Sequence, residues 1–185
     1  MNLRREVSDA LVARGFRRDD RAHLLRVDDE FSLAVDTGPL NKKPDIAPFV
    51  GIRSESVEKL LAKLMELPED EWIGSLGGNV GYVLNQEYRW WGPPSPASDV
   101  LAAIDAALDK LRPFLSLDKL AAAWAFTSKD PAWRYREIVI LLLRGLHDAI
   151  PEHLEAARAE FCQHQDEVCE QFEQFAGNVR TALKT

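Results

Sequence analysis

Glu137-Ile138-Val139-Ile140-Leu141-Leu142-Leu143-Arg144 carries six consecutive apolar residues, which need cover on nearly every side. The rest of the chain must therefore surround this segment. Asp130-Pro131 lies just ahead of it, and a cap acceptor followed by proline is typical of a helix start. The β-branched residues at 138–140 would also suit a buried strand. The capped start and the polar residues at helical spacing favour a helix over about residues 131–148.

The composition of the chain is that of a folded protein. Its 185 residues are 46% apolar and 29% charged, unlike the apolar-poor and highly charged composition of a disordered chain. A chain of this length buries roughly 70% of the surface that its unfolded form exposes, which is enough for one core. The formal net charge of −7 divides into −3 over residues 1–95 and −4 over residues 96–185, so neither half is basic. We therefore expect no nucleic-acid partner.

The sequence shows neither a membrane span nor a secretory signal. Its apolar runs fall far short of the roughly 20 residues that cross a bilayer, and residues 1–6 lack the apolar core of a signal peptide. We therefore expect a cytoplasmic protein with no membrane partner. Cys162 and Cys169 are predicted to share one helix, on which seven residues span about 10.5 Å. This exceeds the roughly 7 Å limit on the Cα separation in a disulfide, so we expect two free thiols and no metal site.

The first half of the chain predicts a sheet with two helices. Phe31, Leu33 and Val35 alternate with smaller or polar residues, which indicates a half-buried strand. The acidic pairs at 19–20 and 28–29 suit the turns of a meander that leads to this strand. The predicted elements are a helix at 3–14, three antiparallel strands at 16–18, 22–27 and 30–36, a strand at 46–53, a helix at 55–66 packed on the sheet, and two strands within 72–91.

A proline-rich segment, Gly92-Pro93-Pro94-Ser95-Pro96, separates this part from a helical one. Helices are predicted at about 99–112, 117–126 and 131–148, and a long one runs from Pro151 to about 179. The predicted fold class is therefore α+β, an antiparallel sheet of about five or six strands with packed helices, followed by a C-terminal helical region. The two lobes are residues 1–92 and 97–185, packed together as one compact domain.

The order of these elements resembles that of some bacterial proteins. The resemblance is carried by an N-terminal helix that ends in Gly15-Phe16, by a meander with polar turns, and by the strand Pro48-Phe49-Val50-Gly51-Ile52-Arg53 with helices after it. These features loosely resemble uncharacterised bacterial proteins classed as domains of unknown function, some of which are similar to immunity proteins. The resemblance covers about residues 1–115. It implies an immunity- or regulator-like role and supplies no catalytic residue.

A concentration of large aromatic residues is the leading candidate site. These residues are Trp72, Tyr82, Tyr88, Trp90 and Trp91. Neighbouring residues on a strand point to opposite faces, so Trp90 and Trp91 can both be buried only if the sheet is covered twice. Trp and Tyr are enriched where partners bind. We therefore predict a partner- or ligand-binding site from these aromatics and Arg53, with an ordinary core as the alternative.

Familiar catalytic signatures are missing: the sequence holds no phosphate-binding loop, zinc-protease motif or nucleophile elbow. We therefore expect a non-enzymatic binding protein without a cofactor, a monomer or homodimer that recognises a protein partner. The alternative is a small-molecule-binding protein or hydrolase with a cleft between sheet and helices, using Arg53, His147 or His153. A third hypothesis is nucleic-acid binding through the arginines at 14–21, which predicts an affinity that falls steeply with salt.

Overall fold

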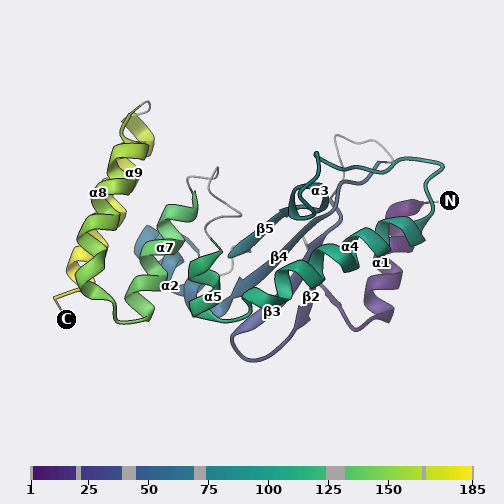
Figure 1. Cartoon of the computed structure of the whole chain (residues 1–185), viewed down its shortest axis with the longest axis horizontal. Helices are drawn as coiled ribbons and strands as arrows, with labels where there is room; N and C mark the ends of the chain where they lie inside the picture. Colours follow the sequence, from purple (N-terminus) through teal and green to yellow (C-terminus); the bar gives the residue numbers. More distant parts are fainter. Residues whose placement is uncertain are drawn as a thin grey trace. The chain divides into compact units, whose positions relative to one another are not determined.

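The sheet is an antiparallel meander of five strands, as a computed structural model of the chain shows. The described residues are 2–19, 22–38, 45–68, 74–123, 132–163 and 166–184. The strands lie side by side in sequence order, and each pairs antiparallel with the next (Figure 1). They are β1 (Arg17–Arg18), β2 (His23–Arg26), β3 (Phe31–Asp36), β4 (Phe49–Ser54) and β5 (Leu76–Asn79). The predicted α+β class, with its antiparallel sheet and C-terminal helices, is confirmed.

The centre of the sheet is the pair β3 and β4, which align from Phe31 opposite Ser54 to Asp36 opposite Phe49. Leu33 on β3 is fully buried, as the alternation predicted. Ala34 is buried too, although its side chain points to the other face. The middle of β3 is therefore covered on both sides rather than half-buried.

The helices begin and end where local signals place them. The Asn2 side chain accepts a hydrogen bond from the Arg5 N–H and caps the first helix. Gly15, with a φ of +92°, follows the end of that helix. The helices are α1 (Leu3–Ala13), α2 (Glu55–Met65), α3 (Val80–Val83), α4 (Ala97–Leu111), α5 (Leu117–Ala122), α7 (Ala132–Leu143), α8 (Ile150–Phe161) and α9 (Asp166–Ala182), with 3₁₀ turns η1 (Arg112–Phe114) and η2 (His147–Ala149). No helix in the described ranges has the length and apolar character needed to cross a bilayer.

The chain divides into two compact units. Unit 1 consists of Met1–Ser54 and Gly74–Leu120, and unit 2 of Glu55–Ile73 and Ala121–Thr185. These boundaries do not coincide with the predicted lobes, because α2 groups with the C-terminal helices and α4 groups with the sheet. The proline-rich segment thus lies inside unit 1, where it connects two parts of the same core.

Unit 1 packs α1 and α4 together with the sheet (Figure 1). The buried stripe of α4 includes Val100, Ile104 and Leu108, which repeat at helical spacing as predicted. Arg14 at the end of α1 forms a bidentate ion pair with Asp105 of α4, at 2.6 and 2.9 Å. Both side chains are about half exposed, so the pair orients the helices more than it stabilises them.

Unit 2 holds α2, which packs against α7 and α9. The sequence predicted that α2 packs on the sheet. This prediction is wrong, because the main partners of α2 are α7 and α9. Its buried stripe includes Val57, Leu61 and Leu64. The stripe cannot distinguish a sheet from a helix pair, because either surface accepts an apolar face. The deciding contact is an ion pair between Glu58 of α2 and Arg136 of α7.

The core of unit 2 is rich in aromatic rings. Tyr135 of α7 lies with its ring centroid 4.8 Å from that of Phe161 and 4.9 Å from that of Phe175. Phe172 of α9 stacks on Phe161 of α8 at 5.2 Å. Burial raises the pKa of the Tyr135 hydroxyl to about 12. These rings hold α7, α8 and α9 together.

Two predicted elements are wrong. Residues 72–91 were predicted to hold two strands, but only β5 forms in the described part of this range, and α3 follows it directly. Val80 and Val83 are buried at a spacing of three, which suits a helical turn and not the alternation of a strand. The long helix predicted from Pro151 to about 179 is two helices, α8 and α9, which pack against each other.

Candidate functional site

Three aromatic side chains form an exposed cluster on unit 1. Phe49 begins β4, Tyr82 lies on α3, and Tyr88 follows in the next loop. The ring of Tyr88 lies edge-on to both neighbours, with centroids 5.7 Å from Tyr82 and 6.3 Å from Phe49. Tyr82 is 59% exposed, Phe49 46% and Tyr88 37%. Edge-to-face contacts favour a fixed arrangement of the rings, so the cluster offers a partner one connected aromatic surface.

Trp90, which is 58% exposed, is a fourth exposed aromatic residue and lies two positions after Tyr88 in the chain. Its segment leads into an isolated β-bridge at Trp91. The guanidinium of Arg89 lies 4.7 Å from the ring centroid of Trp91, so these two side chains share one side of the segment. The alternation of extended backbone places Tyr88 and Trp90 on the other side. We call the exposed set the aromatic patch, and it consists of Phe49, Tyr82, Tyr88 and Trp90.

Asn79 holds the loop of the aromatic patch in place. Its side chain is fully buried and bonds the backbone of Arg89 twice, because Nδ2 donates to the carbonyl at 2.9 Å and Oδ1 accepts from the N–H at 2.8 Å. The same Oδ1 accepts from the N–H of Gly81 at 2.9 Å, which caps α3. One amide therefore joins the end of β5, the start of α3 and the loop beside Tyr88.

Gly81 allows the loop to lie directly against α3. A Cβ atom at this position would lie 1.9 Å from the carbonyl oxygen of Glu87 and 2.9 Å from the backbone nitrogen of Arg89. Only glycine leaves room for this approach of two backbone segments. The patch is consequently preorganised, and a partner would not bear the entropic cost of ordering its loop.

The predicted site residues have different positions. Tyr82, Tyr88 and Trp90 belong to the aromatic patch, while Trp91 is 6% exposed and lies in the core of unit 1. Arg53 is buried on β4 and engaged in contacts there. Trp72 lies outside the described residues. The sequence prediction missed Phe49, although an aromatic residue directly after Pro48, at the start of a strand, was a usable signal.

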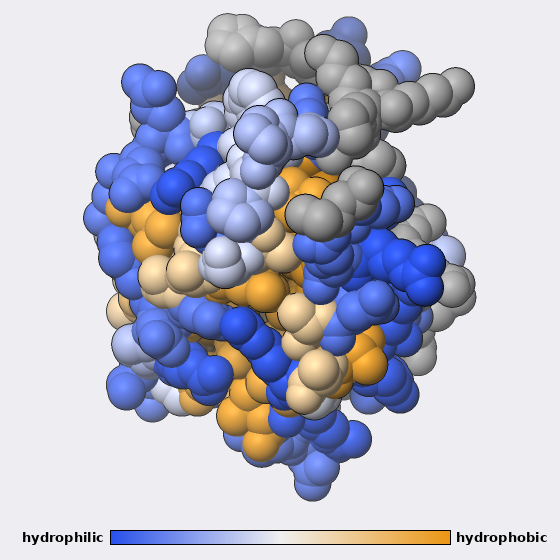
Figure 2. Space-filling view, turned by 90° about the vertical axis from the view of Figure 1, so that its right-hand side faces the viewer, coloured by the Kyte–Doolittle hydropathy of each residue, from blue (hydrophilic) through white to orange (hydrophobic). Residues whose placement is uncertain are grey.

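The surface of the molecule carries both hydrophobic and hydrophilic residues. Figure 2 shows one face of the molecule, on which hydrophobic residues gather in patches between hydrophilic ones. Isolated exposed apolar residues are normal on a soluble protein and carry no functional weight. The aromatic patch differs from them because the rings of Phe49 and Tyr82 both contact that of Tyr88, and its loop is fixed by buried hydrogen bonds.

Of the two histidines named for the hydrolase alternative, His147 is exposed in η2, and His153 belongs to an ion-pair network on α7 and α8. Arg134 bridges Glu137 at 3.0 Å and Glu160 at 2.5 Å, and its hydrogen bond lowers the pKa of the Glu160 carboxyl. His153 Nδ1 lies 3.2 Å from the second oxygen of Glu137. This network joins two helices of unit 2, whereas Arg53 lies in unit 1. The role of this ion-pair network is therefore structural.

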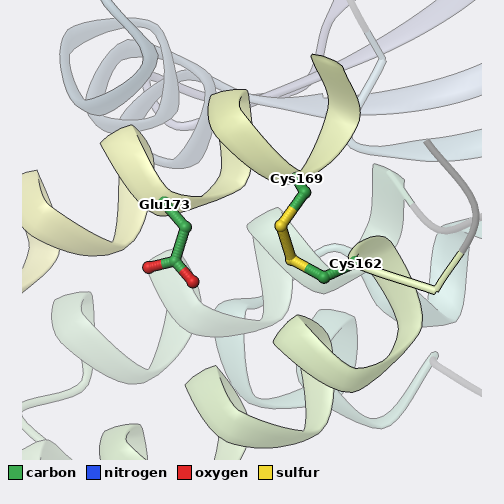
Figure 3. A group of neighbouring side chains, drawn as sticks. All are labelled: Cys162, Cys169 and Glu173. Carbon is green, nitrogen blue, oxygen red and sulfur yellow. A yellow bond between two sulfur atoms is a disulfide. The ribbon is translucent and has the colours of Figure 1, made fainter. Parts of the chain in front are cut away.

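The prediction of free thiols is wrong, because Cys162 and Cys169 form a disulfide (Figure 3). Their Cα atoms are 4.6 Å apart instead of the expected 10.5 Å. The difference arises because α8 ends at Phe161 and α9 begins at Asp166, so the cysteines lie on two helices that face each other. Glu173 lies beside the sulfurs, and the three side chains form a potential metal-ligand group. Metal binding needs thiolates, which bonded sulfurs do not offer.

Removing the disulfide is expected to destabilise the protein. The bond closes a short loop of sequence separation seven, and the chain-entropy account gives about 2.5 kcal/mol for such a loop. We expect Cys162→Ser to lower the free energy of unfolding by this amount, measured by urea denaturation. Dithiothreitol should destabilise the wild type equally and leave the variant unchanged. A wild type that is insensitive to the reductant would contradict the assignment.

Comparison with known proteins gives no match among protein-family models, curated proteins or solved structures. The function is therefore argued from the residues of this chain alone.

Proposed function

We propose that this protein is a non-enzymatic binding protein that recognises a protein partner through the aromatic patch. The observation that carries the proposal is the exposed Phe49–Tyr88–Tyr82 cluster, whose rings contact one another while facing solvent. Aromatic residues of this kind dominate the binding energy of protein interfaces. The buried hydrogen bonds of Asn79 support the proposal, because a preorganised surface binds more tightly than one that must first be ordered.

The charge of the chain indicates the chemistry of the partner. A formal net charge of −7 favours encounter with a basic protein and disfavours nucleic acid. An acidic protein that neutralises a basic partner fits an immunity- or regulator-like role, and we include that role in the proposal. In solution we expect a monomer or homodimer before the partner binds.

The test uses Tyr82→Ala and Trp90→Ala in the full chain. Each variant removes an exposed side chain, so the fold should persist, and each should weaken the affinity for the partner about 30-fold, the effect of losing an interface hot spot. The partner is isolated by photo-crosslinking from position 82, identified by mass spectrometry and titrated by calorimetry. Val27→Ala is the matched control, because Val27 is an exposed apolar residue of unit 1 outside the aromatic patch.

Two outcomes would contradict the proposal. One is a partner whose affinity is the same for the wild type and both patch variants. The other is an equal loss of affinity in Val27→Ala, which would indicate a general effect on the surface rather than recognition by the aromatic patch.

The proposal also places the protein in the cytoplasm. Disulfides are rare in that compartment, because glutathione and thioredoxin keep thiols reduced. A cytoplasmic protein would therefore hold Cys162 and Cys169 partly or wholly as thiols. Trapping free thiols with an alkylating reagent at the moment of cell lysis measures this fraction, and a fully oxidised pair would argue against a cytoplasmic location.

A further inference from the structure

A polar pocket of about 520 Å³ lies in unit 1, between the first turns of α1 and the neighbouring ends of β1 and β2. Nine of the ten described residues that line it are polar or charged. Hydrophobic ligands would find little surface to bury there, whereas a charged ligand would find many hydrogen-bonding groups. The pocket is separate from the aromatic patch, since the two sets of residues have no member in common.

Three arginines from two elements line the pocket: Arg4 and Arg5 on α1, and Arg18 on β1. Arg4 and Arg18 have no ion-pair partner among the residues that the structure describes, while Arg5 Nε lies 3.7 Å from Asp9 in an exposed pair. Such an exposed pair is weak and leaves Arg5 available. The first turns of α1 add the positive end of the helix dipole.

The charge of the pocket differs in sign from that of the whole chain. Among the described lining residues, three guanidinium groups face two carboxylates, those of Asp9 and Asp19, which gives these residues a net charge of +1 on a chain of −7. Positive charge concentrated in a concave site on an acidic protein attracts small anions to that site in particular. A long polyanion would also meet the surrounding negative charge, which argues for a small ligand.

The wall of the pocket includes a buried hydrogen-bonded pair, Ser8 and His23. The Ser8 Oγ and His23 Nε2 atoms are 2.8 Å apart, and both residues are buried. Within the described residues, His23 Nδ1 has no partner in hydrogen-bond geometry. Burial is the largest influence on His23 and lowers its pKa; the backbone of Val35 and the charge of Asp36 raise it, and the charges of Arg18 and Arg4 lower it, so both guanidinium groups act close to the imidazole. A buried polar group without a partner is costly unless a ligand or water completes it.

The Ser8–His23 pair could instead be read as a nucleophile with its base. That role needs a third group that orients the imidazole through Nδ1. Since Nδ1 lacks a partner in hydrogen-bond geometry among the described residues, the pair fits ligand binding better than acyl transfer.

We propose that this pocket binds the phosphate group of a small molecule. A phosphate monoester has three terminal oxygens, and guanidinium groups pair with such oxygens in bidentate fashion. Arginines that approach from α1 and from β1 can contact different oxygens of one phosphate, whereas a carboxylate offers only two. The volume of about 520 Å³ leaves room for an organic part beyond the phosphate.

The experiment titrates the full chain by calorimetry with pyrophosphate and inorganic phosphate, and with malonate as a carboxylate of comparable charge, at constant ionic strength. Saturable binding of pyrophosphate is expected, with weaker binding of malonate. Arg18→Gln should weaken the binding of pyrophosphate about tenfold or more, because a hydrogen bond to a charged group is lost. Arg4→Gln, on the exposed side of a helix, provides a second variant that does not depend on the folding of β1.

The matched control is Arg17→Gln. Arg17 neighbours Arg18 on β1, its side chain points to the opposite face, and it does not line the pocket. The change in net charge is identical, so a general attraction of anions would weaken equally in both variants. Equal weakening, no saturable binding of either phosphate probe by the wild type, or tighter binding of malonate would each overturn the proposal.

Discussion

Replacing Glu58 with glutamine is expected to lower the free energy of unfolding by about 3–5 kcal/mol. Glu58 of α2 and Arg136 of α7 form a bidentate pair, with both N–O distances at 2.9 Å. Their side chains are only 5% and 8% exposed. The amide would take from the buried guanidinium the negative charge that Glu58 supplies at 2.9 Å. Chemical denaturation followed by circular dichroism measures the loss.

The matched control for this change is Glu173→Gln. Glu173 pairs with Arg158 in the same unit, but both side chains are substantially exposed, so the cost should stay below about 1 kcal/mol. A double replacement by apolar residues, Glu58→Leu with Arg136→Met, should recover most of the loss, because no buried charge remains. Equal costs for Glu58→Gln and Glu173→Gln would mean that water reaches the buried pair.

Phe172→Ala is expected to have an effect of similar size, about 3–5 kcal/mol. The ring of Phe172 is 1% exposed and lies among those of Phe161, Tyr135 and Phe175. Its removal would open a cavity that the flanking rings cannot fill without leaving their own contacts. The free energy of unfolding from urea denaturation measures the effect.

Two further variants test the cause of that effect. Phe49→Ala removes the same ring from an exposed position, so it should cost less than about 1 kcal/mol. Tyr135→Phe removes a buried hydroxyl that has no hydrogen-bond partner among the described residues, and it should leave stability unchanged or raise it slightly. A small effect of Phe172→Ala would contradict the tight packing of this core.

Sequence patterns predicted the parts of the fold that are fixed by local signals. The alternation at Phe31, Leu33 and Val35 located β3, and the stripe from Val100 to Leu111 located α4. The glycine at position 15 marked the end of the first helix in the same way. In each case the residue types and their spacing fit the observed element and not the alternative one.

The errors have one physical cause, which is that a local pattern does not say where the chain reverses or what it packs against. The apolar spacing of Leu154, Ala157 and Phe161 is the same as that of Phe172 and Phe175. The pattern therefore does not mark the break between α8 and α9. The only large apolar residue between Phe161 and Phe172 is Val168, and this gap was the available signal for two helices. The prediction of one continuous helix placed Cys162 and Cys169 too far apart for a disulfide. The structure has two helices there, so that spacing does not apply.

The candidate sites were predictable to different degrees. The aromatic patch could be anticipated from composition alone, apart from the burial of Trp91 and the contribution of Phe49. The polar pocket could not, because Ser8 and His23 meet only when α1 packs on β2. Arg18 was part of the predicted basic group, but the structure pairs Arg14 with Asp105 and turns Arg17 to the other face.

The position of α2 between β4 and β5 has a consequence for protein synthesis. The helix leaves the ribosome long before α7 and α9, the helices that cover its apolar stripe. At about 5–20 residues per second, the interval between the synthesis of Met65 and that of Val179 lasts roughly 6–23 s. Until α9 is complete, Val57, Leu61 and Leu64 lack at least part of their native cover, so nascent chains are exposed to aggregation and offer chaperones an apolar helix to hold.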